Sequence, residues 1–200
     1  MEAIMLLVAL PLLVLNLIAG LAGGVGLAFQ GEWGLLFSGL AYSVGGPFLL
    51  SIAMLPGMIF VPLTVWAADR GNTLLAVMSA IPSMVWTYIV VAVSCIVSFA
   101  MIVRGSEGEF FHLLWGYSVA TAPWSYMAQK DKQSGNDNST VLMFFVQMGT
   151  ASMMVAAFAD PYDTSPARLA TWFLPFMGLG LLAQLFIAWV ETRNARYGRF

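Results

Sequence analysis

The chain has 200 residues, of which 60% are hydrophobic and only 9% are charged, and its formal net charge is −2. An average soluble domain is about 25% charged. A soluble globule of this size could not bury so much apolar surface, so we expect lipid to surround most of the chain. The net charge argues against nucleic-acid binding, because neutralising phosphates needs clustered Lys and Arg. The single cysteine, Cys95, cannot form an internal disulfide.

Six apolar segments are candidates for membrane spans, since crossing about 30 Å of hydrocarbon takes roughly 20 apolar residues in a helix. The first follows Met1-Glu2 without a basic residue, which is atypical of a secretory signal, so we expect a retained span. The sequence therefore predicts an all-α, polytopic membrane bundle of about six helices, with residues 1–200 forming a single transmembrane domain. The predicted spans are residues 4–29, 35–68, 73–103, 110–127, 140–159 and 169–190.

The second segment, residues 35–68, is too long for one simple crossing. It contains Gly45-Gly46-Pro47 and, further on, Pro56 and Pro62. Proline lacks a backbone donor and clashes with the preceding turn, so we expect this segment to be kinked or broken. Two alternatives stay open. The segment crosses once, or it begins with a short re-entrant piece before Pro47, which protein or water would have to cover.

The basic residues indicate the orientation of the bundle. If six spans alternate, one side receives six basic residues and the other receives Arg104 and Arg168. Cytoplasmic loops carry an excess of Lys and Arg, so we predict that both termini, the Asp69-Arg70 pair and the loop at 130–139 are cytoplasmic. The six basic residues of that side are Arg70, Lys130, Lys132, Arg193, Arg196 and Arg199.

Tryptophans occur near several predicted span ends. Amphipathic rings prefer the headgroup level of a bilayer, so we expect these residues to be interfacial anchors. They are Trp33, Trp66, Trp124, Trp172 and Trp189.

The groups that usually carry catalysis or metal binding are missing from the spans. The middle of every span lacks Asp, Glu, Lys and Arg, which are the usual marks of ion pathways. Haem and zinc sites need several converging His, Cys or carboxylate ligands, and the lone His112 is expected to be interfacial. Two acid pairs, Glu107 with Glu109 and Asp160 with Asp163, are expected to be solvated loop residues. We therefore predict no enzyme activity, no cofactor and no metal.

Neutral polar residues remain within the spans, notably Asn16, Gln147 and Gln184. Amides in lipid seek partners on neighbouring helices, so the simplest expectation is that they join helices together. The alternative is that they line an intramembrane polar path, which would suit a neutral or lipid-like substrate better than an ion. Gly20 and Gly24 have the spacing of a close helix-packing motif.

From Leu55 onward, the order of features resembles the membrane half of an ABC-A-type exporter. A proline-containing apolar span ends in an acid–arginine pair, in "IFVPLTVWAADRGNTLLAVMSA", and a long returning span follows at 73–103. Gly116-Tyr117-Ser118 comes next, followed by Pro123 and Tyr126, a cytoplasmic turn, a fifth span, an outer loop and a final span. The resemblance covers about residues 55–200.

The resemblance implies that Asp69, Arg70, Gly71 and Asn72 form a turn that couples the chain to a separate ATPase. Asp69 and Arg70 can bond to a partner, and Gly71-Asn72 permits a tight reversal. The alternative is that the charged pair only ends a helix at the headgroups.

The sequence thus favours a multi-pass integral membrane subunit that is permease-like and moves a lipid-like or neutral substrate with a separate ATPase partner. The alternative is a non-catalytic structural or assembly subunit of a larger membrane complex. The expected partners are membrane lipids and an ATPase or other membrane subunits, and not nucleic acid.

Overall fold

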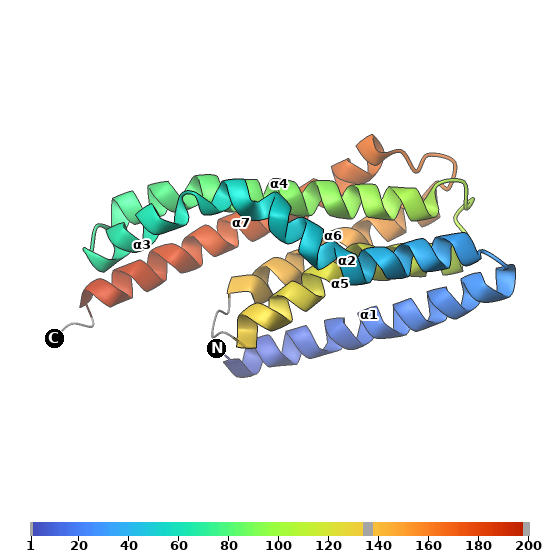
Figure 1. The fold of residues 1–200 in the computed structure, drawn as a ribbon, viewed down its shortest axis with the longest axis horizontal. Helices are drawn as coiled ribbons and strands as arrows, with labels where there is room; N and C mark the ends of the chain where they lie inside the picture. Colours follow the sequence, from blue (N-terminus) through green and yellow to red (C-terminus); the bar gives the residue numbers. More distant parts are fainter. Residues whose placement is uncertain (1, 134–137, 198–200) are drawn as a thin grey trace.

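The computed structural model describes residues 2–133 and 138–197, which fold into seven helices with no strand between them. The helices lie along the long axis of an elongated bundle (Figure 1), which confirms the prediction of an all-α helical bundle. The helices are α1 (Glu2–Gln30), α2 (Trp33–Met58), α3 (Val61–Asp69), α4 (Thr73–Val103), α5 (Phe110–Gln133), α6 (Asn138–Ala159) and α7 (Pro166–Tyr197).

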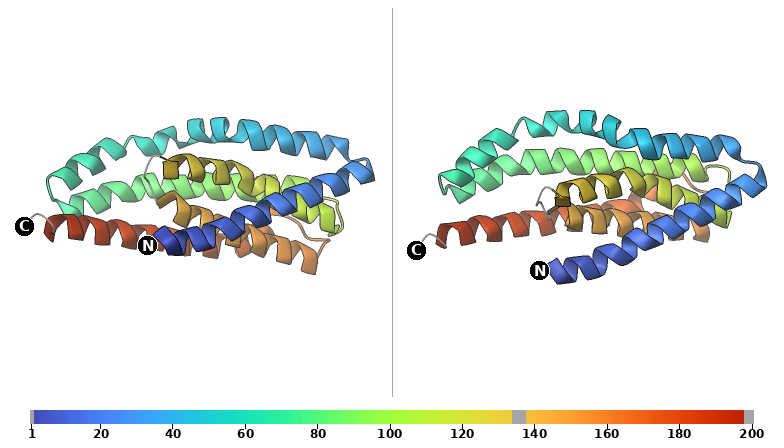
Figure 2. Two further views of the ribbon diagram at one scale, coloured as in Figure 1. Left: turned by 90° about the horizontal axis from the view of Figure 1, so that it is seen from below. Right: turned by 60° about the horizontal axis from the view of Figure 1, so that its bottom comes forward.

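Successive passes alternate in direction, with α2 and α3 together making one pass (Figures 1 and 2). The start of α1, the α3–α4 turn and the end of α7 therefore lie toward one end of the bundle, called here the terminal end. The loops that join α1 to α2, α4 to α5 and α6 to α7 lie toward the other, called the opposite end. The predicted grouping of both termini with the Asp69-Arg70 pair agrees with this arrangement, and its cytoplasmic location stays a prediction.

Within the residues that the structure describes, five helices are long and apolar enough to cross a membrane, which is consistent with a multi-pass integral membrane protein. They are Leu10–Gln30, Trp33–Met58, Thr73–Val103, Ser139–Ala159 and Pro166–Glu191.

Helix α5, predicted as the fourth span at 110–127, is not among these five helices. Its 24 residues give a length of about 36 Å at 1.5 Å per residue, which is enough to cross the hydrocarbon layer. It packs against α1, α2, α4 and α6. A helix enclosed by four others needs less hydropathy than one that faces lipid, so α5 can be the more polar centre of the bundle.

The expected interruption of segment 35–68 is present, but it comes late in the segment. Pro47 and Pro56 both lie inside α2, which ends at Met58. Helix α3 then begins at Val61 with Pro62 in its first turn, where the missing N–H of proline removes no helical hydrogen bond. The two helices continue in one direction (Figure 1), so the segment makes one broken pass and does not reverse before Pro47.

The main core lies where α4, α5, α6 and α7 meet. Phe99, Val146, Met153 and Phe173 belong to one apolar cluster and have no exposed surface. This core explains why α4 is the most buried of the apolar helices. The outward faces of α1 and α2 remain apolar and exposed, as expected for surfaces that meet lipid.

The contact between α1 and α5 depends on glycine. A Cβ atom added at Gly23 would lie 2.6 Å from the backbone N of Trp115, and one at Gly20 would lie 2.5 Å from Oγ of Ser118. Small residues let two helices approach this closely in lipid. The Trp115 indole N–H donates to the carbonyl of Leu35 at 3.2 Å, so Trp115 joins α2 to the same seam.

Four of the five tryptophans expected at the interface are about half exposed, and the prediction is wrong for the fifth. Trp33, Trp66, Trp172 and Trp189 expose 52%, 46%, 47% and 43% of their surface. Trp124 is only 3% exposed, and its indole N–H donates to Oγ of Ser94 on α4 at 3.1 Å. Trp124 therefore binds helices together and does not anchor the chain at a surface.

We predict that Gly23→Ala destabilises the protein by about 1–3 kcal/mol, because the new methyl group must push apart two helix backbones. Gly178→Ala is the matched control, since no atom lies within 4 Å of its Cβ position. The control should be neutral, or stabilising by up to about 1 kcal/mol through helix propensity. Thermal unfolding in detergent measures both variants, and equal effects would contradict the assignment of the seam.

Candidate functional site

The α3–α4 turn is built by hydrogen bonds of its own backbone. The N–H of Gly71 donates to the carbonyl of Ala68 at 2.9 Å, and the N–H of Asn72 donates to that of Ala67 at 2.9 Å. This is the Schellman pattern that closes a helix C-terminus, and it needs a left-handed residue, which Gly71 supplies with φ +69°. Asn72 then caps α4, because its side-chain oxygen accepts from the N–H of Leu75 at 3.2 Å.

The two charged residues of the turn differ in what they do for the fold. Cζ of Arg70 lies 4.4 Å from the centroid of the Trp66 ring, a cation–π contact within one turn of α3. Asp69 is exposed at the last position of α3, and the hydrogen bonds described above, which build the turn, do not use its carboxylate. The turn therefore holds its shape without Asp69.

Two of the three residues predicted to line a polar path, Asn16 of α1 and Gln147 of α6, form hydrogen bonds with side chains of α5. The Asn16 amide donates to the hydroxyl of Thr121, and the hydroxyl of Ser118 donates to the Asn16 carbonyl oxygen at 3.2 Å. The hydroxyl of Tyr117 donates to the carbonyl oxygen of Gln147 on α6. We call this set the polar layer, and it consists of Asn16, Tyr117, Ser118, Thr121 and Gln147.

The polar layer is closed to solvent. Asn16 is 9% exposed, Thr121 is fully buried and Gln147 is 1% exposed. The Gln147 amide nitrogen has no hydrogen-bond partner among the described residues. Asn16 and Gln147 therefore join α1 and α6 to α5, which is the simpler of the two expectations. Their part in a polar path stays a prediction.

Gln184, the third predicted path residue, lies at a different depth. It is buried in α7. The positions of Gly149 against Phe173 and of Gly180 against Phe145 show how α6 and α7 align. In this antiparallel alignment Gln184 lies about 9–14 Å along the axis from the level of Gln147, at 1.5 Å per residue. The structure therefore does not bring Gln184 into the polar layer.

Three functional side chains of the polar layer were not among the predicted path residues: Tyr117, Ser118 and Thr121. A usable signal was present in the sequence, because hydroxyl groups at positions i and i+4 of one helix fall on the same face. A segment of low hydropathy among strongly apolar ones also indicates a helix that other helices enclose. Both signals point to α5 as the source of hydrogen-bond partners for the amides.

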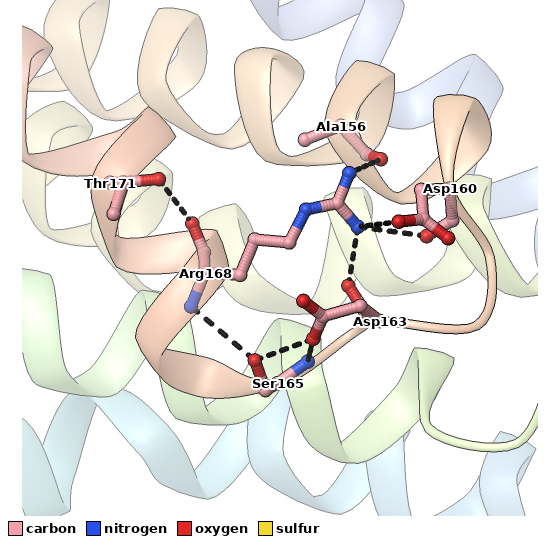
Figure 3. Close-up of polar contacts among 6 residues, drawn as sticks. All are labelled: Ala156, Asp160, Asp163, Ser165, Arg168 and Thr171. Atoms are coloured by element: carbon pink, nitrogen blue, oxygen red, sulfur yellow. Dashed lines mark hydrogen bonds and ion pairs between the residues drawn. The ribbon is translucent and has the colours of Figure 1, made fainter.

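Arg168 holds the α6–α7 loop at the opposite end of the bundle (Figure 3). Its guanidinium donates to the carbonyls of Ala156 at 3.2 Å, Asp160 at 2.9 Å and Asp163 at 2.6 Å. The carbonyl of Ala156 also accepts from the backbone N–H of Asp160, and Asp160 follows the last residue of α6. Arg168 therefore holds the end of α6 to the loop that follows it. A carboxylate oxygen of Asp160 also lies 3.5 Å from the guanidinium. The acids of this loop are thus partly structural, although we expected them only to be solvated.

Asp163 and Ser165 shape the start of α7. The hydroxyl and the backbone N–H of Ser165 donate to one carboxylate oxygen of Asp163, at 2.7 Å and 3.2 Å. Two hydrogen bonds lower the pKa of Asp163 below its ordinary value: the bond from the Ser165 hydroxyl has the larger effect, and the bond from the Ser165 N–H has the smaller one. These bonds fix the residue that precedes Pro166 at the first position of α7.

His112 is buried, whereas we expected it at the interface. Its Nδ1 lies 3.2 Å from a carboxylate oxygen of Glu109 in a geometry that is not a hydrogen bond. The amide of Gln30 donates to the same carboxylate oxygen at 2.7 Å, which ties the end of α1 to the start of α5. Across residues 2–133 and 138–197, no group of three or more His, Cys, Asp or Glu side chains is placed to hold a metal ion.

No protein-family model matches this chain, no curated protein matches it, and no solved structure matches it. The resemblance to the membrane half of an ABC-A-type exporter is therefore neither supported nor refuted, and it stays a prediction.

We predict a measurable coupling between Asn16 and Thr121. Asn16→Leu and Thr121→Val should each destabilise the protein, because each leaves a buried partner unpaired. The double variant should be less destabilised than the sum of the two, by about 1 kcal/mol. Thermal or denaturant unfolding in detergent measures the cycle. Strictly additive effects would show that the two side chains do not stabilise each other.

We predict that acid weakens the α6–α7 loop through Asp163. A carboxyl whose pKa is lowered on folding stabilises the folded state above its unfolded pKa of about 3.9. This contribution is lost as the pH falls through the folded pKa. Asp163→Asn should therefore lose less Tm than the wild type when the pH is lowered below about 4. Ser165→Ala, which removes the hydroxyl donor, should give an intermediate slope. A wild-type slope in Asp163→Asn would contradict this role.

Proposed function

We propose that this chain is a permease-like membrane subunit that moves a neutral or lipid-like substrate and works with a separate ATPase at its α3–α4 turn. The observation that carries the proposal is the position of Asp69. This position gives an exposed carboxylate to a turn whose backbone hydrogen bonds and Asn72 cap form without it. A charge fixed in this way suits contact with a partner in water.

The turn is connected to the rest of the bundle in a way that supports transmission of motion. Helix α3 is bound to α4 by the hydroxyl of Thr64, which donates to the hydroxyl of Ser79 at 3.0 Å. Helix α4 has 31 residues, about 46 Å at 1.5 Å per residue, and contacts α2, α5, α6 and α7. A force on the turn would therefore reach most of the bundle through α4.

The interior supports a neutral or lipid-like substrate. Apart from His112 near the start of α5, the buried polar side chains in the described part of the spans are amides and hydroxyls, such as Asn16, Thr121, Gln147, Thr150 and Gln184. An ion at the middle of a bilayer is costly unless opposite charges or many polar groups surround it. Amides and hydroxyls can instead satisfy the few hydrogen-bonding groups of a neutral solute or a lipid.

We predict that Asp69→Asn lowers ATP hydrolysis by a co-purifying ATPase about tenfold, which is the effect of losing one charge-assisted hydrogen bond. The matched control is Glu32→Gln, which removes one exposed carboxylate at the opposite end of the bundle. The measurement is the ATPase activity of the tagged chain, purified with its partners and reconstituted in liposomes. If no ATPase co-purifies, or if the two variants behave alike, the coupling proposal fails.

A second candidate is a non-catalytic structural or assembly subunit of a larger membrane complex. The specific observation in its favour is that the Asn16 amide and the side-chain oxygen of Gln147 are hydrogen-bonded to α5 and so serve packing. This candidate predicts stable co-purification with several membrane proteins, without substrate transport by the chain in liposomes. Transport by the purified chain and one ATPase would count against it.

A further inference from the structure

Two exposed stripes at the terminal end of the bundle repeat the same order of side chains. Each stripe places an apolar residue, a tryptophan and an arginine at positions i, i+3 and i+7 of a helix, which fall on one face. The α3 stripe is Leu63, Trp66 and Arg70, and the α7 stripe is Phe186, Trp189 and Arg193.

The two stripes also share their geometry. Cζ of Arg70 lies 4.4 Å from the Trp66 ring centroid, and Cζ of Arg193 lies 5.3 Å from that of Trp189. Both tryptophans are nearly half exposed, at 46% and 43%. The rings of Phe186 and Trp189 are 6.0 Å apart, so the aromatic and cationic groups of α7 form one continuous surface.

Both stripes are oriented alike with respect to the bundle. Helices α3 and α7 both run toward the terminal end, where the α3–α4 turn lies beside the last turns of α7 (Figures 1 and 2). In each stripe the apolar residue is thus nearest the middle of the bundle, the tryptophan comes next and the arginine is outermost. A phospholipid presents its acyl chain, glycerol region and phosphate in the same order.

We propose that these two stripes bind the headgroups of anionic phospholipids in the leaflet at the terminal end. A planar guanidinium stacked on an indole directs its N–H groups outward in its own plane, which matches the oxygens of a phosphate. The indole prefers the headgroup level, and Leu63 and Phe186 extend the contact along the acyl chain. A free phosphate would use only the outermost part of this surface.

The distribution of charge along the sequence supports an anionic ligand at this end. The segments that the sequence assigns to the side of both termini and of Arg70 carry six basic and five acidic residues, a net charge of +1. Those assigned to the opposite end carry two basic and five acidic residues, a net charge of −3. Anionic lipids attract basic groups near the membrane surface, so the terminal end is the favoured one.

The test compares the full chain in phosphatidylcholine nanodiscs with the same chain in nanodiscs that also contain phosphatidylglycerol with identical acyl chains. We expect phosphatidylglycerol to raise the Tm of the wild type. The double variant Arg70→Gln/Arg193→Gln should lose more than half of this rise. Arg70→Lys/Arg193→Lys should keep part of it, because lysine retains the charge but loses the planar stack.

Arg104→Gln is the matched control, since it removes an exposed arginine at the opposite end, and it should keep the full rise. Equal gains in the wild type and the double glutamine variant would overturn the proposal, as would an equal loss in Arg104→Gln. Inorganic phosphate added to the phosphatidylcholine nanodiscs should have no effect at matched ionic strength. If phosphate alone reproduces the rise, the stripes bind a soluble anion and the lipid assignment is wrong.

Discussion

The structure depends on enclosing one polar helix within apolar ones. Lipid offers no hydrogen-bond partners, so a polar side chain at membrane depth must be satisfied by another helix. Helix α5 carries Tyr117, Ser118 and Thr121, and it is surrounded by α1, α2, α4 and α6. The amides of Asn16 and Gln147 meet these hydroxyls from two sides. The glycines of α1 bring its backbone close enough to α5 for this contact to form.

The helix termini at the two ends of the bundle are stabilised by different interactions. At the terminal end the α3–α4 turn uses glycine geometry and an asparagine cap, which leaves Asp69 available for another role. At the opposite end Arg168 donates to the carbonyl of Ala156 near the end of α6 and to that of Asp160 just beyond it. An enclosed polar centre and closed helix ends give a stable frame, while the α3–α4 turn and the two tryptophan–arginine stripes face water or the headgroups. The proposed contacts with an ATPase and with anionic lipid therefore lie at exposed side chains of the terminal end.

Local signals in the sequence were sufficient to predict most helix boundaries. The span predicted at 73–103 coincides with α4, because Gly71 and Asn72 mark its start and a mostly apolar stretch without a charged residue runs to Arg104. The break between α2 and α3 was harder to locate, since neighbouring helices can accommodate a proline inside a membrane helix. Pro47 and Pro56 are tolerated within α2, and the indole of Trp86 donates to the carbonyl of Ala53 at 2.8 Å near the second of them.

Properties that arise from contacts between distant segments could not be predicted. The sequence around Trp124 indicates an amphipathic ring near a helix end, but only the packing of α4 on α5 decides that it is buried against Ser94. The relative depth of Gln147 and Gln184 depends on how α6 and α7 align, which is set by Gly149 and Gly180 against two phenylalanines. The amides could thus be picked out in the sequence as polar residues of apolar segments, whereas their partners required the three-dimensional arrangement.

The central claim is that α5 crosses the membrane as the enclosed polar helix of the bundle, so that its two ends face opposite compartments. The most direct test places single cysteines at Glu107 and Lys130, which are exposed beside the two ends of α5, in a Cys95→Ala background. Sealed membrane vesicles are then treated with a membrane-impermeant maleimide, and Asp69→Cys marks the side of the α3–α4 turn. We expect Lys130→Cys to react from the same side as Asp69→Cys, and Glu107→Cys only from the other side. Reaction of Glu107→Cys and Lys130→Cys from one side would contradict this account.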